Sequence, residues 1–475
     1  MLKKSGGHTF AVIVLLAAFL LLITRRVSSD PYVYDEADYM YAASLGFLAN
    51  YTDTPTLSII DYLRAGISRG KDAKARQDLS DAVRRSNDVA FYRHWHGPLF
   101  HYLLIPASRL GRDEHRVRIW MLAIPVASLV AMYLGCLWLL PGFRGFLAAL
   151  LASTLFLASY AVTASTELAP HQLFVLCSLC FLFLLAKAVA TGQRTYWYGA
   201  VFTTAIAFCT LEIALVLILT TGICGYLERR QLHADWAFAA RSLTLFLATV
   251  LVLWPAAILR LSFVKAYLGL AYLALSRKSP WGGIGFLETW RGRVFASPLE
   301  WGIILLSLAL YFRGCSKGRR ILYPVLVCAL LTITATLRVL SDTPRYSLLF
   351  MPELDLFAGL ALADCIERLR RPAMAVASAL IIGIYAAAQY QSSAHRPYLN
   401  PRSTAVLSFI HQNHLDNKGL LVPQDDLPML HYYFPASRLR GYHTFYPEHS
   451  DRLEFKADAI LYPSYPVEFE VMQRH

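Results

Sequence analysis

Charged residues are scarce in this sequence: Asp, Glu, Lys and Arg make up 16% of its 475 residues, whereas 56% are hydrophobic. A typical soluble globular protein carries charge on about a quarter of its residues, so this class is excluded. Apolar runs of membrane-spanning length recur from residue 9 to residue 391. The composition therefore predicts a polytopic membrane protein.

The sequence lacks a nucleic-acid-binding motif, although its net charge is +13. Lys and Arg collect instead in short loops, where positive charge sets the orientation of membrane helices. We therefore expect a lipid bilayer around the protein and no nucleic-acid partner.

Cysteine is absent from the long polar segments. All eight cysteines fall in expected spans or in loops expected on the cytoplasmic side, so no disulfide framework is predicted on the outer face. Cys177 and Cys180 form a C-x-x-C in the middle of an expected span, where packing is the favoured role.

No small-x-small cleavage site separates the first apolar run, TFAVIVLLAAFLLLIT, from Arg25 and Arg26. A cleaved signal peptide normally has such a site, so this run is predicted to remain as a membrane anchor. Lys3 and Lys4 precede the run and predict a cytoplasmic N-terminus.

The hydropathy pattern predicts about eleven membrane crossings. Residues 196 to 226 are too long for one crossing, and a single helix there would place the basic loops at 313 to 320 and 368 to 371 outside. Two short helices meeting near Thr210 to Glu212 keep those loops in the cytoplasm and place the C-terminus outside. The other spans are predicted near residues 9 to 24, 117 to 139, 143 to 162, 168 to 189, 236 to 257, 299 to 312, 321 to 338, 345 to 364 and 372 to 390.

The predicted fold is thus an all-α polytopic membrane module over residues 1 to 390, followed by a small extracytoplasmic α/β domain over residues 391 to 475. The two long outer loops of the module are residues 25 to 116 and 258 to 298, and chemistry is expected on that face. In the tail, periodicity predicts helices at 403 to 415 and 428 to 434 and strands at 419 to 423 and 458 to 463.

Three carboxylates gather directly after the first span, in YDEADYMYAA beginning at Tyr34. The following residues put Met40, Ala43 and Phe47 on one apolar face, as in a helix lying along the membrane surface. Asp35 and Asp38 have the spacing of a capping box, so helix capping is an alternative role for Asp35.

Histidines gather at the end of the first outer loop, in FYRHWHGPLFHYLLIP, residues 91 to 106. His94, His96 and His101 fit no common zinc spacing, so a divalent metal is not indicated and no cofactor is predicted. Anchoring of aromatic and histidine side chains at the membrane interface is the alternative role of this segment.

Several of these elements together resemble the glycosyltransferase C superfamily, in the branch of protein O-mannosyltransferases and aminoarabinose transferases. The similar elements are YDEADYMYA (34 to 42), HWHGPLFHYLL (94 to 104), EHRVRIWMLAIPVASL (114 to 129) and DTPRYSLLFMPELDLFAGLAL (342 to 362). The resemblance extends over about residues 9 to 390. This sequence has Gly97-Pro98 where the family usually has two prolines, and the stretch from Asp35 to His96 is longer than is typical.

The resemblance implies an inverting glycosyltransferase that moves a sugar from a polyprenyl-phosphate donor to a hydroxyl group of a glycan, lipid or protein. It also implies a bacterial-type plasma membrane with the active site on the outer face. The departing lipid phosphate is a stable anion, so one base and one cationic clamp suffice, in contrast to glycoside hydrolysis. Asp35 is the predicted base and Arg345 the predicted phosphate clamp.

Further polar residues are predicted to belong to the same site. Glu36 is expected to orient the base or to bind the acceptor. The remaining candidates for donor or substrate binding are His96, Glu167, His171, Arg291 and Tyr346. Anchoring at the membrane interface is the alternative role of Glu167, His171 and Arg291. Glu212, at the expected helix break, is an ionisable residue at membrane depth, for which capping of the second short helix is the alternative role.

A membrane transporter or lipid flippase is the alternative function, because broken helices and buried carboxylates suit one too. Against it, no inverted repeat is visible, the spans are unevenly spaced, and polar residues cluster at one face rather than at the midplane. A receptor whose tail binds a partner is a further alternative.

Overall fold

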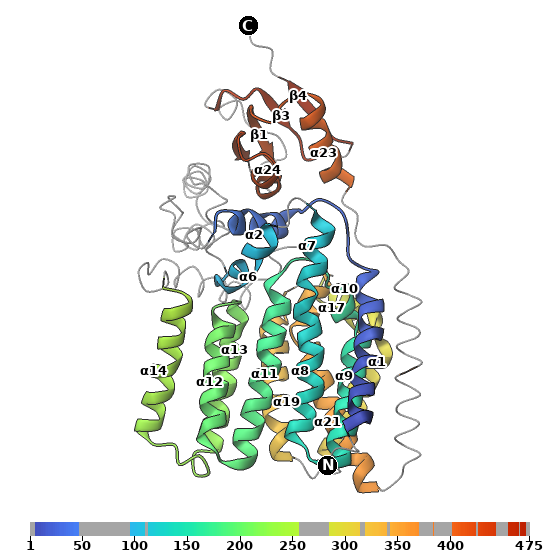
Figure 1. Cartoon of the computed structure of the whole chain (residues 1–475), viewed down its shortest axis with the longest axis vertical. Coiled ribbons are helices and arrows are strands. Elements are labelled where there is room, and N and C mark those ends of the chain that lie inside the picture. The colour runs from blue at the N-terminus through green and yellow to red at the C-terminus, as the bar shows by residue number, and fades with distance from the viewer. Residues whose placement is uncertain are drawn as a thin grey trace.

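The computed structural model describes most of the chain. The described residues are 5 to 46, 96 to 109, 113 to 255, 285 to 313, 319 to 339, 343 to 369, 383, 401 to 423, 426 to 442, 455 to 464 and 466 to 471. They form a bundle of roughly parallel helices with a small sheet-containing domain at one end, and α1 begins at the opposite end (Figure 1).

The bundle is built from helices that are mostly apolar. They are α1 (Ser5–Thr24), α7 (Glu114–Met121), α8 (Ala123–Leu139), α9 (Gly142–Ala158), α10 (Tyr160–Ala164), α11 (Pro170–Thr191), α12 (Arg194–Phe208), α13 (Leu215–Leu227), α14 (Trp236–Leu253), α18 (Pro298–Phe312), α19 (Arg319–Thr336) and α21 (Met351–Leu369). Shorter helices complete the module: α2 (Tyr34–Ser44), α6 (Leu99–Ser108), the 3-10 helix η3 (Glu212–Ala214), α17 (Phe286–Ala296) and α20 (Pro344–Leu348). Among them, α2 and α6 lie across the end of the bundle that faces the sheet domain (Figure 1).

The number of membrane crossings stays a prediction. Within the described residues, three helices are long and apolar enough to cross a bilayer: Glu114–Leu139, Pro170–Thr191 and Trp236–Leu253. A fourth is added if α17 and α18, which meet at 92°, are counted as one span, and further apolar helices are shorter. The predicted span at 372 to 390 lies outside the described residues, apart from residue 383.

The break predicted within residues 196 to 226 is confirmed. Helix α12 ends at Phe208 and α13 begins at Leu215, with η3 between them. The backbone N–H of Leu99 donates to the carbonyl oxygen of Cys209 at 3.1 Å. A Cβ on Gly97 would lie 2.1 Å from that same oxygen, so glycine is required where the family usually has a proline.

Small residues allow close packing inside the bundle. Helices α9 and α21 approach so closely at Gly359 that a Cβ there would lie 2.6 Å from the Cβ of Ala152. Small residues at such contacts are typical of helix pairs in membranes. Large apolar side chains on the outer faces remain exposed, for example Phe10 (69%) and Leu305 (61%), as expected of a surface that contacts lipid.

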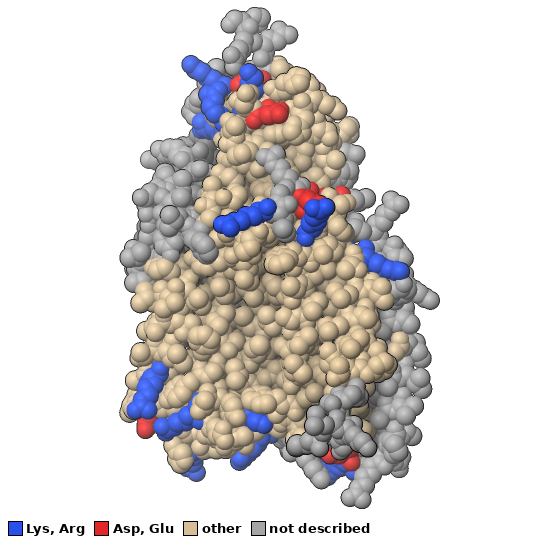
Figure 2. All heavy atoms as spheres, viewed as in Figure 1, with Lys and Arg blue, Asp and Glu red and all other residues tan. Residues whose placement is uncertain are grey.

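Basic residues predicted to be cytoplasmic lie at the end of the bundle away from the sheet domain. Arg144, near the start of α9, pairs with Asp364 near the end of α21. Lys187 donates to the carbonyl oxygen of Trp138 at 3.1 Å. On the face shown in Figure 2, a broad band without charged side chains separates the charges at the two ends. This distribution is the one expected of a bundle embedded in a bilayer.

The C-terminal residues form a four-stranded sheet with two helices. The elements are α23 (Pro401–Gln412), β1 (Gly419–Pro423), α24 (Leu427–Tyr433), β2 (Arg438–Tyr442), β3 (Ala459–Leu461) and β4 (Phe469–Val471), and the strand order is β2-β1-β3-β4. Strand β1 is parallel to both of its neighbours, and β4 is antiparallel to β3. Both predicted helices and both predicted strands are confirmed, whereas β2 and β4 were not predicted.

Candidate active site

Helix α2 carries the acidic residues of the opening motif. It begins at Tyr34, and its N-cap residue, Val33, is extended and provides no side-chain cap. Asp35 therefore lies inside the first turn, and the alternative role of Asp35 as the N-cap is wrong. A carboxylate in the first turn is favoured by the helix dipole. Met40 and Ala43 are buried as predicted, and Phe47 lies outside the described residues.

Arg345 lies directly against Asp35. Helix α20, which starts at Pro344, presents the guanidinium so that its Nη1 is 3.0 Å from Oδ2 of Asp35. Its Nη2 donates to the hydroxyl of Tyr346 at 3.4 Å. Burial disfavours the charge on Arg345, but Asp35, Tyr346 and Glu167 outweigh this effect and raise its pKa. The predicted base and the predicted clamp are thus neighbours, and the guanidinium stays charged.

Glu167 and His171 complete this group from the start of α11. Oε1 of Glu167 is 3.7 Å from Nε of Arg345. The ring of His171 stands edge-on to the ring of Tyr346, with the centroids 5.8 Å apart. Burial raises the pKa of Glu167 to about 6, although Arg345 acts in the opposite direction. We call Asp35, Glu167, His171, Arg345 and Tyr346 the Arg345 cluster.

The Arg345 cluster is not sealed. The side chains of Asp35 and Glu167 keep 36% and 35% of their surface exposed. Residues around them, in contrast, are buried, including Tyr39 and His171. The two carboxylates are therefore accessible from outside the protein.

His96 and Glu212 form a second pair beside the cluster. Nδ1 of His96 is 2.8 Å from Oε2 of Glu212. Burial alone would lower the pKa of His96, but Glu212 outweighs it and the pKa is raised. Asp35 acts in the same direction and Arg345 in the opposite one, so the pair and the cluster lie within electrostatic reach of each other. Neither η3 nor α13 has a side-chain cap, so the capping alternative for Glu212 is wrong.

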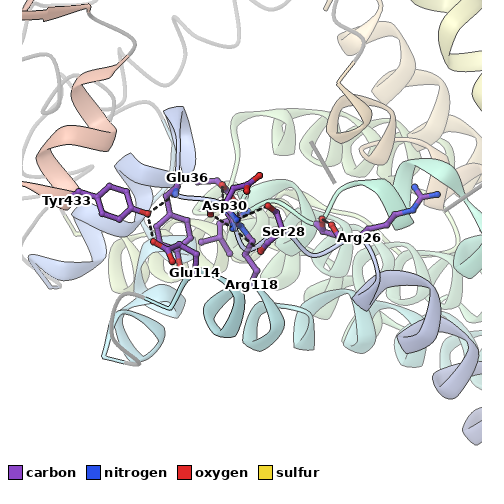
Figure 3. Close-up of polar contacts among 10 residues, drawn as sticks. Arg26, Ser28, Asp30, Glu36, Glu114, Arg118 and Tyr433 are labelled. Atoms are coloured by element: carbon purple, nitrogen blue, oxygen red, sulfur yellow. Dashed lines mark hydrogen bonds and ion pairs between the residues drawn. The ribbon is translucent and has the colours of Figure 1, made fainter. Parts of the chain in front are cut away.

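Glu36 is paired with Arg118 rather than with Arg345, and it holds α2 in place. Both of its carboxylate oxygens accept from Arg118 on α7, Oε1 from Nε at 3.0 Å and Oε2 from Nη2 at 2.7 Å. Oε1 also accepts from the backbone N–H of Leu168 at 2.7 Å. Nη1 of Arg118 donates to the carbonyl oxygens of Ser28 (3.0 Å) and Asp30 (2.7 Å), as Figure 3 shows. Glu36 and Arg118 thus join α7 to the chain that leads into α2.

Arg118 was not singled out from the sequence, although it lies in the segment that resembles the family's second span. The sequence pattern that could have identified Arg118 is its place beside the apolar residues Val117 and Met121 of α7. In the structure Arg118 is 4% exposed. A buried arginine requires a partner, and only the fold identifies that partner as Glu36.

Arg291 is not brought to the Arg345 cluster by any contact among the described residues. It lies on the exposed face of α17, with its guanidinium 5.5 Å from the ring centre of Phe295. The buried arginine of α17 is Arg293, whose Nη2 donates to the carbonyl oxygen of Val339 at 2.7 Å. The sequence pattern does not distinguish Arg293 from Arg291, because the burial of Arg293 depends on packing of α17 onto the bundle.

An apolar groove lies between α12 and α14. Its volume is about 430 Å³. The lining residues are Leu99, Phe202, Ile206, Ala248, Thr249, Val252 and Leu253. Leu99, which follows His96 closely in sequence, links the groove to the polar end of the bundle. Among the described residues, no group of three or more His, Cys, Asp or Glu side chains is placed to hold a metal ion.

Comparison with known proteins identifies the fold. No protein-family model and no curated protein matches the sequence. The structure is similar to ArnT from Cupriavidus metallidurans bound to undecaprenyl phosphate, with 15% identity, a TM-score of 0.59 and coverage of 92% of this chain and 86% of that chain. It is also similar to the oligosaccharyltransferase AglB from Archaeoglobus fulgidus in complex with an inhibitory peptide and a dolichol-phosphate, with 12% identity, a TM-score of 0.61 and coverage of 97% and 69%. The chain therefore has the glycosyltransferase C fold, as its motifs predicted.

Proposed function

We propose that this protein is an inverting glycosyltransferase that moves a sugar from a polyprenyl-phosphate donor to a hydroxyl-bearing acceptor. It works on the outer face of a bacterial-type plasma membrane, with its N-terminus in the cytoplasm and its C-terminus outside. The contact of 3.0 Å between the Asp35 carboxylate and the Arg345 guanidinium supports this proposal most directly. A base and a cation side by side, open on one side, are what this reaction needs.

Asp35 is the proposed general base. It accepts the proton of the acceptor hydroxyl while the hydroxyl oxygen attacks the anomeric carbon of the sugar. The bond between that carbon and the phosphate oxygen breaks, and the electron pair leaves with the polyprenyl phosphate. Attack from the side opposite to the phosphate inverts the anomeric configuration.

Arg345 is the proposed phosphate clamp. Its Nη1 faces Asp35 and its Nη2 faces Tyr346, so further N–H groups remain for the phosphate oxygens of the donor. In this arrangement one guanidinium contacts both the base, Asp35, and the leaving group, the donor phosphate. It therefore fixes the position of the sugar relative to Asp35, and the acceptor hydroxyl binds between Asp35 and the anomeric carbon. This arrangement favours attack by proximity and stabilises the charge that develops on the phosphate.

The donor lipid is proposed to extend from the Arg345 cluster along the apolar groove between α12 and α14. The His96–Glu212 pair, which is within electrostatic reach of the Arg345 cluster, is proposed to contact the sugar or the phosphate, together with Glu167 and His171. ArnT and AglB were solved with undecaprenyl phosphate and a dolichol-phosphate, which are lipids of this class. Arg291, on the exposed face of α17, is assigned to contacts with lipid headgroups.

The test is a transfer assay with the purified protein in liposomes. A panel of polyprenyl-phosphate sugars is supplied together with hydroxyl-bearing glycans, lipids and peptides, and mass spectrometry follows donor and acceptor. We expect free polyprenyl phosphate and glycosylated acceptor in equal amounts. Movement of the intact donor across the bilayer without cleavage would instead establish the flippase alternative.

A further inference from the structure

The C-terminal domain shares a hydrophobic core with α2. Helix α24 packs on α2, and the ring of His431 stacks on that of Tyr41 with the centroids 5.6 Å apart. Met40 of α2 and Leu430 of α24 belong to the same buried cluster. The domain is therefore seated on the helix that carries Asp35.

Tyr433, the last residue of α24, makes a polar link at this contact. Its hydroxyl donates to Oε1 of Glu114 on α7 at 2.5 Å and accepts from the backbone N–H of Tyr32 at 2.9 Å. Figure 3 shows the phenol reaching from the C-terminal domain to the chain that precedes α2. Burial and the bond to Glu114 raise the pKa of Tyr433, so the phenol keeps its proton and can donate.

The start of α2 needs such support because it lacks a cap of its own. Val33, the N-cap residue, is extended and provides no side-chain cap. Arg118 holds the carbonyl oxygens of Ser28 and Asp30, and Tyr433 holds the N–H of Tyr32. Tyr32 lies three residues before Asp35 and just outside α2. A shift of Tyr32 therefore also moves the Asp35 carboxylate relative to Arg345.

We propose that Tyr433 is a positioning residue, through which the C-terminal domain holds Asp35 in register with Arg345. The proposal rests on the role of Asp35 in the proposed function. The C-terminal domain is then part of the catalytic apparatus, in addition to any contact that it makes with an acceptor. Tyr433 itself touches neither donor nor acceptor and acts through Tyr32 and Glu114.

The first test is Tyr433→Phe, which keeps the packed ring and removes both hydrogen bonds. Since displacement of a catalytic group by about 1 Å can cost up to about 10²-fold in rate, we expect kcat to fall about 10-fold or more with the donor KM within about twofold. Adding Glu114→Ala to Tyr433→Phe should lower kcat by less than about twofold further, because the same link is already lost.

Tyr462→Phe is the matched control. It removes a hydrogen bond of the same type, from the Tyr462 hydroxyl to Oε2 of Glu470 at 3.0 Å, within the C-terminal domain and away from α2. This variant should keep kcat within about twofold of wild type. Equal losses in the two variants, or a loss in Tyr433→Phe that falls on the donor KM, would overturn the proposal.

Hydrogen exchange gives a readout that does not depend on activity. Amides of residues 28 to 40, followed by mass spectrometry of the purified protein, should exchange about 10-fold faster in Tyr433→Phe than in wild type or in Tyr462→Phe. Unchanged exchange in this segment would refute the positioning role even if kcat fell. If the wild-type protein transferred no sugar, the proposed function would fail, while the exchange comparison would still decide whether Tyr433 holds the start of α2.

Discussion

Two carboxylate environments in the described part of the chain differ in their partners. In the Arg345 cluster, Asp35 and Glu167 face a guanidinium and remain about one-third exposed. Inside the bundle, Glu353 on α21 is 1% exposed. It accepts hydrogen bonds from the hydroxyls of Ser178 at 2.6 Å and Thr332 at 3.1 Å, so its partners are neutral.

This difference indicates a catalytic role for one group of carboxylates and a structural role for the other. An ionisable residue in a membrane helix is a functional candidate by default, but Glu353 joins α11, α19 and α21 through hydrogen bonds with no open side. Asp355, two residues further along α21, is buried as well. Opposite charge together with partial exposure supports the proposal that the Arg345 cluster is the site of the reaction.

The largest expected effect is that of Asp35→Asn. Asparagine has nearly the same shape but cannot accept a proton at neutral pH, so transfer at saturating donor and acceptor should fall by about 10² to 10⁴. Donor binding should be unchanged or tighter, because Arg345 loses a competing anion. Initial rates of the purified variant and donor titrations measure the two quantities.

Glu36→Gln is the neighbouring comparison for Asp35→Asn. It breaks a buried ion pair with Arg118, so thermal stability should fall, while the loss of kcat should be smaller than for Asp35→Asn. Near wild-type transfer by Asp35→Asn would remove Asp35 from the chemistry and turn attention to Glu167.

Changes at Arg345 come next in size. Arg345→Ala should weaken binding of a non-transferable donor analogue about 10- to 100-fold, because a charge-assisted bidentate contact is lost. Arg345→Lys keeps the charge but not the fork and should lie between the alanine variant and wild type. Titration of the analogue by tryptophan fluorescence or calorimetry measures the affinity. Wild-type affinity in the alanine variant would assign the phosphate to another cation, with His96 the next candidate.

Sequence patterns predicted the members of the Arg345 cluster but not the contacts that support it. Motif order placed Asp35, Glu167 and Arg345 on one side of the membrane, and the structure brings these three together. The links through Arg118 and Tyr433 join segments far apart in the chain, and hydropathy carries no information about such pairs. They therefore became visible only in the fold.

The two edge strands of the sheet, β2 and β4, were also not predicted from the sequence. Strand β2 reads RLRGY and is partly exposed, so it lacks the apolar run by which β1 was predicted. Strand β4 has only three residues, too few to show an alternating pattern. Both strands form because the buried strands β1 and β3 offer free edges, which is a property of the sheet rather than of the local sequence.

A smaller effect is expected for the pH dependence of donor binding. The pKa of Glu167 is raised to about 6, so the carboxyl is neutral below that pH and negative above it. The phosphodiester of a polyprenyl-phosphate sugar is anionic at every pH between 5 and 7. A negative Glu167 beside Arg345 repels this phosphate, and a neutral Glu167 does not. Affinity for the donor should therefore weaken by about 3- to 10-fold as the pH rises from 5 to 7.

Glu167→Gln removes the titrating group and should bind the donor tightly at both pH values. A wild-type affinity that does not change between pH 5 and 7 would refute the repulsion by Glu167. A Glu167→Gln variant that keeps the wild-type dependence would assign that dependence to another group. His96 is the next candidate, because it loses positive charge as the pH rises and so weakens phosphate binding in the same direction.

The smallest expected effect is at Glu353, the buried carboxylate with neutral partners, for which we expect no role in the reaction. In Glu353→Gln, the amide oxygen can accept from Ser178 or Thr332, and the hydroxyl oxygens can accept from the new NH₂ group. The transfer rate should therefore stay within about twofold of wild type, and the variant should lose no more than about 1 kcal/mol of stability. Glu353→Ala removes the hydrogen bonds to Ser178 and Thr332 and leaves a cavity. It should therefore lose more stability, about 2 kcal/mol or more, again with little change in kcat. Thermal unfolding in detergent and initial transfer rates measure the two effects. A stable Glu353→Gln protein that no longer transfers sugar would show that buried carboxylates with neutral partners also take part in the reaction, and the distinction between the two environments would no longer hold.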